Sequence, residues 1–257
     1  MTVLSVDARR HSEHFGEAAQ VRESLDSAIR LTLLPWMASP NTAGMRSTTV
    51  DQEVAGIPIR VTIESDAGRI DLNETPTDLI AAYFEAAGWP AERAKTLAAR
   101  IVDWRDPKDM AEALGAEAPI YANTGRRNPP RNGPFQSVGE LRRVFGGEAL
   151  DEGLVDGLTV YSRRAEPSRS ECVPSVCAAL NWRDRHLTAG ADETTSREPP
   201  SSVTVSLQDQ VSLIGEIIRV RACAQDNRHA PCRQLIGRLT GNTTHPLQVF
   251  EWQSSFN

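Results

Sequence analysis

The chain has 257 residues, of which 40% are hydrophobic and 24% are charged, and its formal net charge is −6 at pH 7. This composition supplies enough apolar material for a core, which excludes an intrinsically disordered chain. The acidic balance argues against a nucleic-acid-binding surface, because contacts with phosphate groups need a local excess of Lys and Arg.

The sequence shows neither a membrane span nor a signal peptide. Its longest apolar stretch, Leu31–Met37, is interrupted by Thr32 and Pro35 and stays well below the ~20 residues that a spanning helix needs. Met1–Arg10 lacks a basic start followed by an apolar run. Taken literally, these features predict a cytosolic protein.

One long helix and one strand are predicted first. Between Glu13 and Trp36, apolar residues recur at steps of three and four, which predicts an amphipathic helix. Residues 38–53 are rich in Ser, Thr, Asn and Gly and predict a loop. Gly56–Glu64 alternates apolar with polar residues, which predicts a half-buried strand. The charged face of the helix comprises Arg22, Glu23, Asp26 and Arg30.

Two helices are predicted close together after this strand. Thr75 is placed to cap the first helix, and Pro76 suits its first position. The helix ends at Ala87, with Gly88 in the left-handed conformation beyond it. Residues 90–104 predict the second helix, so the pair opens a compact helical block.

The helical block continues beyond a loop over residues 115–134. Ser137-Val-Gly-Glu140 has the spacing of a capping box, which predicts a third helix that ends at Gly146. Ser137→Ala is then expected to cost ~1 kcal/mol through the lost cap. A short fourth helix is predicted over Leu150–Leu154.

The rest of the chain changes to strands, with one helix among them. Val173–Trp182 predicts the helix, and residues 188–202 predict a polar surface loop. Alternating patterns predict strands of an antiparallel meander. These strands cover residues 158–161, 203–207, 216–223, 232–239 and 247–252. A helical block that interrupts a helix-plus-sheet unit predicts an inserted subdomain.

The four cysteines form two close pairs, Cys172 with Cys177 and Cys223 with Cys232. Paired cysteines are typical of disulfides in an oxidising compartment, and four free thiols in a cytosolic protein remain the alternative. The predicted strands on either side would bring Cys223 opposite Cys232, within the Cα separation of a disulfide. A zinc site that includes His229 is disfavoured, because the cysteine spacings match no common zinc motif.

An acidic cluster follows the second helix of the block. It comprises Asp103, Asp106, Asp109, Glu112 and Glu117. Calcium takes about six to eight oxygen ligands, and carboxylates at a helix end and in its loop can supply several of them. The spacing is not that of an EF-hand loop. Two interpretations stay open: a calcium site, and a solvated acidic face with helix caps.

Five short motifs stand in one order across the middle of the chain. They are Gly68-Arg-Ile-Asp-Leu-Asn73, Ile101-Val-Asp-Trp-Arg-Asp106, Gly115-Ala-Glu117, Tyr121 and Pro134-Phe-Gln-Ser-Val-Gly-Glu-Leu141. The set resembles the general secretion pathway protein K family, whose pattern contains GR-[IF]-[DN]-LN, [IV]-DW-x-D, GAE and PF-x-S-x-x-EL. Val249-Phe-Glu-Trp252 also suits the closing hairpins of the family. The resemblance therefore extends over most of the chain.

The resemblance implies an α+β protein with a pilin-like fold, in which a long N-terminal helix lies on an antiparallel sheet. An all-helical domain of the SAM-like or helix-hairpin-helix-like kind would be inserted after an early strand. The expected parts are residues 1–67 with the helix and first strand, 68–157 with the inserted domain, and 158–257 with the remaining helical segment and C-terminal strands. The resemblance also favours calcium at the acidic cluster.

The resemblance implies a structural function. Members of the family are minor pseudopilins at the tip of the type II secretion pseudopilus, bound to the I- and J-type minor pseudopilins. They help to start assembly of the pseudopilus and hence the export of folded periplasmic proteins. They are anchored in the cell inner membrane and project into the periplasm. This chain shows neither the basic leader nor the apolar helix half of the family, so we expect the anchor in a segment missing from it.

The apolar helix face carries the expected partner contacts. Val21, Leu25, Ile29 and Leu33 are expected to cover the sheet and, with the upstream part of the helix, to form the partner-binding surface.

Two other functions are weighed against this one. No pairing of nucleophile and base, His pair or phosphate loop accompanies Asp103, Trp104 or Asn73, so we predict no catalytic site. The runner-up function is a helix-hairpin-helix module that binds nucleic acid. Its hairpin would be Ala87-Gly-Trp-Pro90, where Pro90 has no amide to donate to a phosphate. The sequence therefore favours a scaffold that binds protein and no nucleic acid.

Overall fold

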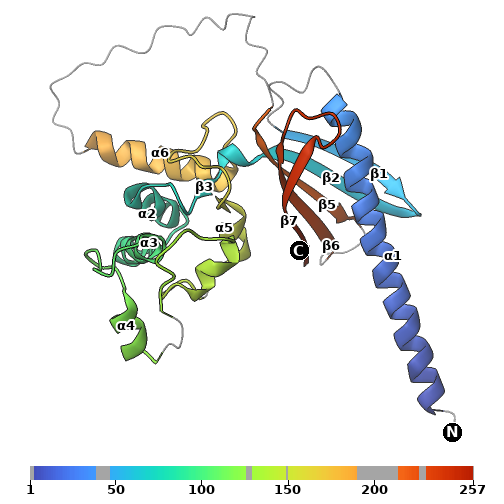
Figure 1. Ribbon diagram of the computed structural model, residues 1–257, viewed down its shortest axis with the longest axis horizontal. Helices are drawn as coiled ribbons and strands as arrows, with labels where there is room; N and C mark the ends of the chain where they lie inside the picture. The colour runs from blue at the N-terminus through green and yellow to red at the C-terminus, as the bar shows by residue number, and fades with distance from the viewer. Residues whose placement is uncertain are drawn as a thin grey trace, which may run out of the picture. The chain divides into compact units, whose positions relative to one another are not determined.

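A computed structural model describes residues 3–38, 47–125, 129–148, 150–189, 214–225 and 230–256 of the chain. These residues form two compact units (Figure 1). Unit 1 comprises Met1–Ser65 and Leu207–Asn257, and unit 2 comprises Asp66–Ser206. The predicted strand over residues 203–207 lies outside the described residues, as does most of the predicted loop 188–202.

Unit 1 is a five-stranded antiparallel sheet with one long helix packed against it (Figure 1). The helix is α1 (Val3–Ala38). The strands, in their spatial order, are β1 (Ser47–Val54), β2 (Ile57–Ser65), β5 (Ile217–Ala224), β6 (Pro231–Leu239) and β7 (Leu247–Phe256). The predicted combination of a long helix with an antiparallel sheet is thus confirmed. Among the described residues, no helix is both long and apolar enough to cross a membrane.

The apolar face of α1 forms the core of unit 1. Leu25, Ile29 and Leu33 are at most 5% exposed and pack against the inward face of the sheet, while Val21 lies at the margin of this core. The sheet contributes Ile59, Val61, Ile63, Ile218, Val220, Ala222, Leu235 and Leu239. The prediction that this helix face covers the sheet is confirmed. Its assignment as a partner-binding surface is wrong for the three buried residues, because the sheet already occupies them.

Asp26 corrects the predicted charged face of the helix. Its carboxylate accepts hydrogen bonds from Arg233 Nε at 2.7 Å and from Trp252 Nε1 at 3.0 Å. The side chain is only 8% exposed, since β6 and β7 extend the sheet beneath this side of α1. Asp26 is therefore an internal tie between helix and sheet, whereas Arg22, Glu23 and Arg30 are exposed.

The predicted loop over residues 38–53 is also corrected. Residues 47–54 form β1, which pairs with β2 along its whole length. Thr and Val fit such an edge strand, and Gln52 fastens it to α1 by donating to the carbonyl of Ala28 at 3.0 Å and to Thr32 Oγ1 at 2.8 Å. Ser and Thr alone did not distinguish a polar edge strand from a loop.

Unit 2 is built from short helices around one apolar cluster. Two short strands, β3 (Ile70–Asp71) and β4 (Leu158–Thr159), pair in parallel within it. The helices are α2 (Thr77–Ala86), α3 (Ala91–Arg105), α4 (Ala118–Asn123), α5 (Glu152–Asp156) and α6 (Pro174–Ala189), with 3₁₀ turns at Asp66–Gly68 and Val138–Arg143. The helical block after the first predicted strand is confirmed in its order, and the loop 115–134 contains α4 in addition.

The end of unit 2 differs from the expected division of the chain. The predicted part 158–257 joins the helix near residue 180 to the C-terminal strands. In the structure, Val176, Ala179 and Leu180 of α6 are buried in the apolar cluster of unit 2, and α6 packs on α2. The described segment from 158 to 189 therefore belongs to the helical unit, because α6 buries its apolar face there.

Neither Thr75 nor Ser137 caps a helix in the way that the sequence predicts. Thr75 Oγ1 accepts a hydrogen bond from the amide of Asp71 at 3.1 Å, while Pro76 occupies the N-cap of α2. Ser137 has an extended backbone and makes no side-chain capping bond, and the turn it precedes is 3₁₀ rather than α-helical. Gly88 does adopt the predicted left-handed conformation, with φ of 87°.

Candidate functional site

The Gly68–Asn73 segment runs through the centre of unit 2. A Cβ atom on Gly68 would lie 2.0 Å from the carbonyl oxygen of Glu171, so no larger residue fits there. The segment then forms β3 beside β4, and Ile70 and Leu72 are fully buried. The segment is therefore packed on all sides, which explains why the motif combines glycine with apolar residues.

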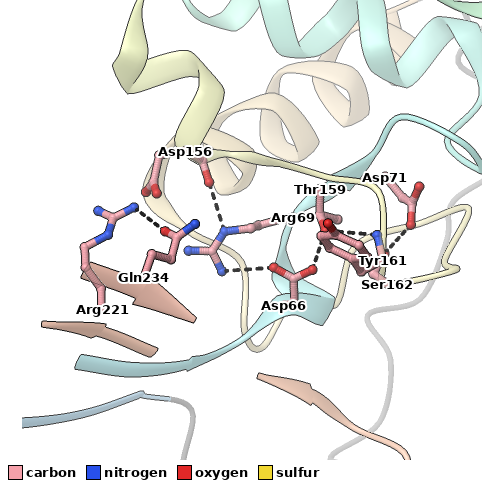
Figure 2. Close-up of polar contacts among 9 residues, drawn as sticks. All are labelled: Asp66, Arg69, Asp71, Asp156, Thr159, Tyr161, Ser162, Arg221 and Gln234. Carbon is pink, nitrogen blue, oxygen red and sulfur yellow. Dashed lines mark hydrogen bonds and ion pairs between the residues drawn. The ribbon is translucent and has the colours of Figure 1, made fainter. Parts of the chain in front are cut away.

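Arg69 is buried in a polar network at the start of this segment (Figure 2). Its Nε donates to the carbonyl of Asp156 at 2.9 Å, and its Nη1 lies 3.9 Å from Asp66 Oδ1. The hydroxyl of Thr159 donates to the other oxygen of Asp66. Because an unpaired buried charge is strongly unfavourable, these contacts are what allow Arg69 and Asp66 to stay inside.

Asp71 and Asn73 fasten two other segments of unit 2, residues 160–163 and the loop at Phe135, by hydrogen bonds. Asp71 accepts bonds from the amide of Asn73 at 2.8 Å, the hydroxyl of Ser162 at 3.0 Å and the amide of Arg163 at 2.8 Å. Burial raises the pKa of the Asp71 carboxyl, and these hydrogen bonds oppose the rise. Asn73 donates to the carbonyl of Phe135 at 3.0 Å and accepts from its amide at 2.7 Å.

Three of the four remaining motifs contribute residues to the same place. Arg105 donates to the carbonyl of Leu72 at 2.6 Å, and burial lowers the pKa of its guanidinium. Trp104 stacks on Phe135 with ring centroids 6.0 Å apart and lies 6.2 Å from the ring of Tyr121. We call this convergence the motif hub: it consists of residues 68–73, Trp104, Arg105, Tyr121 and Phe135. Most of its polar side chains bond to one another or to the backbone, so the hub supports the fold of unit 2. Nε1 of Trp104 is buried and has no hydrogen-bond partner among the described residues.

Two of the predicted metal ligands are buried beside the hub. Asp103 is fully buried and Glu117 is 4% exposed. Asp103 Oδ1 accepts a hydrogen bond from the amide of Glu112 at 3.1 Å. Asp103 Oδ2 and both carboxylate oxygens of Glu117 have no hydrogen-bond partner among the described residues. Buried carboxylate oxygens without donors are costly for a protein and suit a cation.

The other acidic residues of the cluster already have protein partners or stay at the surface. Asp106 accepts a hydrogen bond from the amide of Lys108 at 2.8 Å, and Asp109 accepts one from Nδ2 of Asn132 at 2.9 Å. The side chain of Glu112 is exposed. Within the described part of the chain, no group of three His, Cys, Asp or Glu residues converges on a possible metal position. Of the residues predicted as metal ligands (Asp103, Asp106, Asp109 and Glu117), Asp103 and Glu117 are those with buried oxygens that have no hydrogen-bond donor among the described residues.

The pKa values of the two buried carboxyls, Asp103 and Glu117, are both raised. Burial raises the pKa of Asp103 and of Glu117, and repulsion between the neighbouring carboxylates raises both further. The amides of Glu112 and Ala116 oppose the rise at Asp103, and the amide of Ala118 opposes it at Glu117. A hard divalent cation would remove the same penalty by supplying positive charge, so Asp103 and Glu117 fit a calcium ion provided that neutral oxygens complete its shell.

The structure pairs the four cysteines as two disulfides, Cys172 with Cys177 and Cys223 with Cys232. Cys223 and Cys232 stand directly opposite each other on β5 and β6, with their Cα atoms 4.1 Å apart. Cys172 and Cys177 lie 5.4 Å apart between their Cα atoms, just before and within α6. His229, the third residue of the disfavoured zinc site, lies outside the described residues.

Sequence patterns missed two residues that matter to these sites. Arg69 was recognised only as part of a motif, and its burial depends on contacts with residues about 90 positions away, such as Asp156. For Asn132 the sequence predicts only a loop, although Asn-Gly is a recognisable turn signal. The φ angle of Asn132 is 50°. Neither pattern reveals which atoms face the acidic cluster.

The comparisons with known proteins agree with the motifs. Residues 64–151 match the family described as "Type II secretion system (T2SS), protein K", and this match contains all five motifs. The fold is similar to that of a chain in the crystal structure of the GspK-GspI-GspJ complex from the enterotoxigenic Escherichia coli Type 2 Secretion System. The TM-score is 0.63 at 16% sequence identity, and the alignment covers 96% of this chain and 99% of that chain. Among curated proteins none matches.

These comparisons bear on the competing predictions. The resemblance to the protein K family is confirmed over residues 64–151, and the likeness of the fold extends over nearly the whole chain. Neither comparison supports a helix-hairpin-helix protein that binds nucleic acid.

Proposed function

We propose that this protein is a minor pseudopilin of the K type in a type II secretion machine, and that it acts by binding other proteins rather than by catalysis. The observation that carries the proposal is the protein K match over residues 64–151, whose motif residues form the hub of unit 2. The hub explains the motifs as structural, because most of its polar side chains bond to backbone groups.

The proposed partners are the I- and J-type minor pseudopilins. The similar solved chain comes from a complex that contains GspK, GspI and GspJ. In this chain the partner contacts cannot use Leu25, Ile29 and Leu33, which are buried. Leu31 and Leu34 on α1 are each 60% exposed, and we assign the helical contact to them. Large apolar side chains that stay exposed on one helix are favourable points for another helix to pack.

The finer role follows from the resemblance. The protein would sit at the tip of the pseudopilus, help to start its assembly and so support the export of folded periplasmic proteins. Its described part would lie in the periplasm, with attachment to the inner membrane. The two disulfides support an oxidising compartment. Mass spectrometry of periplasmic protein without reductant should count no free thiols, and four free thiols would contradict this location.

Reconstitution of the ternary complex tests the function. The chain should co-purify with the I- and J-type minor pseudopilins of the same organism, and a Leu31→Asp, Leu34→Asp variant should lose this complex. The matched control is Arg22→Ala with Glu23→Ala, two exposed positions on the same helix that should leave it intact. Folded partners that fail to associate with the unmodified chain would refute the proposal.

We also propose that Asp103 and Glu117 hold a calcium ion. When bound, calcium would supply charge compensation for two buried carboxylates, three of whose four oxygens have no donor among the described residues. Dialysis against a chelator should lower the melting temperature, and calcium should restore it. Asp103→Asn should abolish the calcium effect. An unchanged melting temperature in chelator would contradict the calcium site and favour the alternative, a solvated acidic face with helix caps.

A further inference from the structure

A groove on the surface of unit 2 is lined by residues of α2, α3 and α6 and has a volume of about 730 Å³. α2 packs against both of the other helices, and Figure 1 shows it between them, so α2 forms the floor of the groove and α3 and α6 form its sides. The floor contains Asp78, Ala82 and Glu85, and the sides contain Ala91 of α3 and Trp182 and His186 of α6. The groove therefore follows one face of α2 for about two turns.

The shape and the mostly apolar lining of this groove suit a helix. Ala82 gives the middle of the floor a small side chain. The indole of Trp182 stacks on the ring of His186, with centroids 3.6 Å apart, and forms one wall. Small residues let two helices approach closely, at the lower end of the ~8–10 Å range of interaxial distances. A helix that lay on α2 between α3 and α6 would cover the apolar lining, as the fourth helix of a bundle does.

The charges of the groove indicate which kind of helix fits. Asp78 and Glu85 are seven residues apart, so they lie on one face of α2, about 10 Å apart along its axis. Among the described residues, neither carboxylate has a hydrogen bond or an ion pair. On the α6 side, Arg183 is paired with Glu166 at 3.1 Å. The floor therefore offers two negative charges, two helical turns apart, to a partner with matching positive charges.

We propose that this groove is a docking site for an amphipathic helix of another protein. The apolar stripe of that helix packs on Ala82 and Trp182. Two of its Lys or Arg side chains, two turns apart, pair with Asp78 and Glu85. A groove of this kind recognises anchor residues at steps of three, four and seven along the bound helix. The site uses neither α1 nor the acidic cluster, so it stands independently of the partners and the calcium site proposed above.

A synthetic peptide tests the docking site directly. The probe is a fluorescein-labelled amphipathic helix of about 18 residues, because shorter helices are marginal in water. It carries Leu at steps of three and four, and Lys at two positions two turns apart. Fluorescence polarisation with the full chain gives the affinity. We expect saturable binding of this peptide and no binding of a peptide that has the same composition in scrambled order.

Variants of the full chain locate the peptide on the floor of the groove. Glu85→Lys should weaken binding by about 10-fold, because an attraction becomes a repulsion. A peptide with Glu in place of the matching Lys should bind Glu85→Lys better than it binds the unmodified chain. Glu92→Lys makes the same change in net charge at an exposed position outside the groove, so it should leave both affinities unchanged. Ala91→Trp, at an exposed position that lines the groove, should weaken both peptides by narrowing it.

The opposite results overturn the inference. If the unmodified chain binds no probe, or binds the scrambled peptide equally well, the groove does not recognise an amphipathic helix. Equal weakening by Glu85→Lys and Glu92→Lys would mean that the peptide responds only to net charge. Unchanged affinity in Ala91→Trp would place the peptide outside the groove. Self-association of the full chain that Ala91→Trp abolishes would assign the groove to a second copy instead. Circular dichroism establishes that each variant is folded.

Discussion

Different interactions stabilise the interior of unit 1 and the interior of unit 2. Unit 1 relies on a continuous antiparallel ladder and a broad apolar contact with α1, so its stability is spread over many interchangeable positions. Among the described residues of unit 2, the strand pairing is the two-residue contact of β3 with β4, and the helices pack around an apolar cluster. Side chains that bond to distant backbone groups hold its loops in place. Particular residues therefore fix the loops of unit 2 in a way that unit 1 does not need. This contrast explains why the recognisable motifs fall within residues 64–151.

Gly68→Ala is expected to have the largest effect, because it disturbs the close packing inside unit 2. The new Cβ would lie 2.0 Å from a backbone oxygen, which cannot rotate away as a side chain can. We expect a loss of about 3 kcal/mol in the free energy of unfolding, at the upper end for overpacking. Urea denaturation measures it.

Gly139→Ala provides the matched control in the same unit. The nearest atom to its new Cβ would be Ser137 Oγ, at an ordinary 3.7 Å. We expect this change to stay within about 0.5 kcal/mol of the unmodified protein. Equal losses in the two variants would mean that the close approach of Gly68 to Glu171 does not exist in solution.

Removal of the Cys223–Cys232 disulfide tests the distributed stability of unit 1. The bond closes a short loop between neighbouring strands, and the chain-entropy model assigns ~2–3 kcal/mol to a loop of about ten residues. The double variant Cys223→Ala, Cys232→Ala should lose this amount but keep its sheet, because the ladder around it is intact. Circular dichroism and urea denaturation check both parts. A variant that no longer folds would show that unit 1 depends on one link after all.

Tyr83 offers a pH-dependent test of unit 2. Burial raises the pKa of its phenol to about 12, and its hydroxyl donates to the carbonyl of Leu154 at 2.7 Å. The folded protein thus retains the proton more tightly than the unfolded chain, whose tyrosines ionise near pH ~10. Its stabilising contribution is complete below that pH and is lost as the pH rises towards about 12.

Tyr83→Phe should remove this dependence. At ~1.4 kcal/mol per pKa unit, the unmodified protein should lose roughly 2 kcal/mol relative to the variant across this alkaline range. At neutral pH the variant should be less stable by ~1 kcal/mol, since the Leu154 carbonyl loses its donor. Urea denaturation of both proteins at several pH values makes the comparison. Parallel pH curves would show that the phenol ionises normally in the folded protein.

The sequence predicted unit 1 better than unit 2, for a physical reason. Periodicity reveals helix and strand faces, so the apolar face of α1 and strands β2, β5, β6 and β7 were found, and two cysteines across a hairpin implied their bond. Loop packing has no such period. The burial of Arg69 and the convergence of Asn73 with Phe135 depend on contacts between residues as much as 87 positions apart. The motifs indicated that these residues matter without indicating what they touch.

Ser137 shows the same distinction at the smallest scale. The Ser137-x-x-Glu140 pattern predicts a capping box worth ~1 kcal/mol at the serine. In the structure the serine makes no capping bond. Glu140 alone is engaged: it accepts a hydrogen bond from the amide of Gln136 at 3.1 Å and one from Arg131 Nη1 at 3.1 Å.

Ser137→Ala should therefore change the free energy of unfolding by less than about 0.5 kcal/mol. Glu140→Ala should cost about 1–2 kcal/mol, because it leaves a backbone donor and a cation without their acceptor. Urea denaturation of the two variants distinguishes the cases: a full 1 kcal/mol loss at Ser137 would mean that the local pattern, and not the tertiary contact of Glu140, determines how this turn begins.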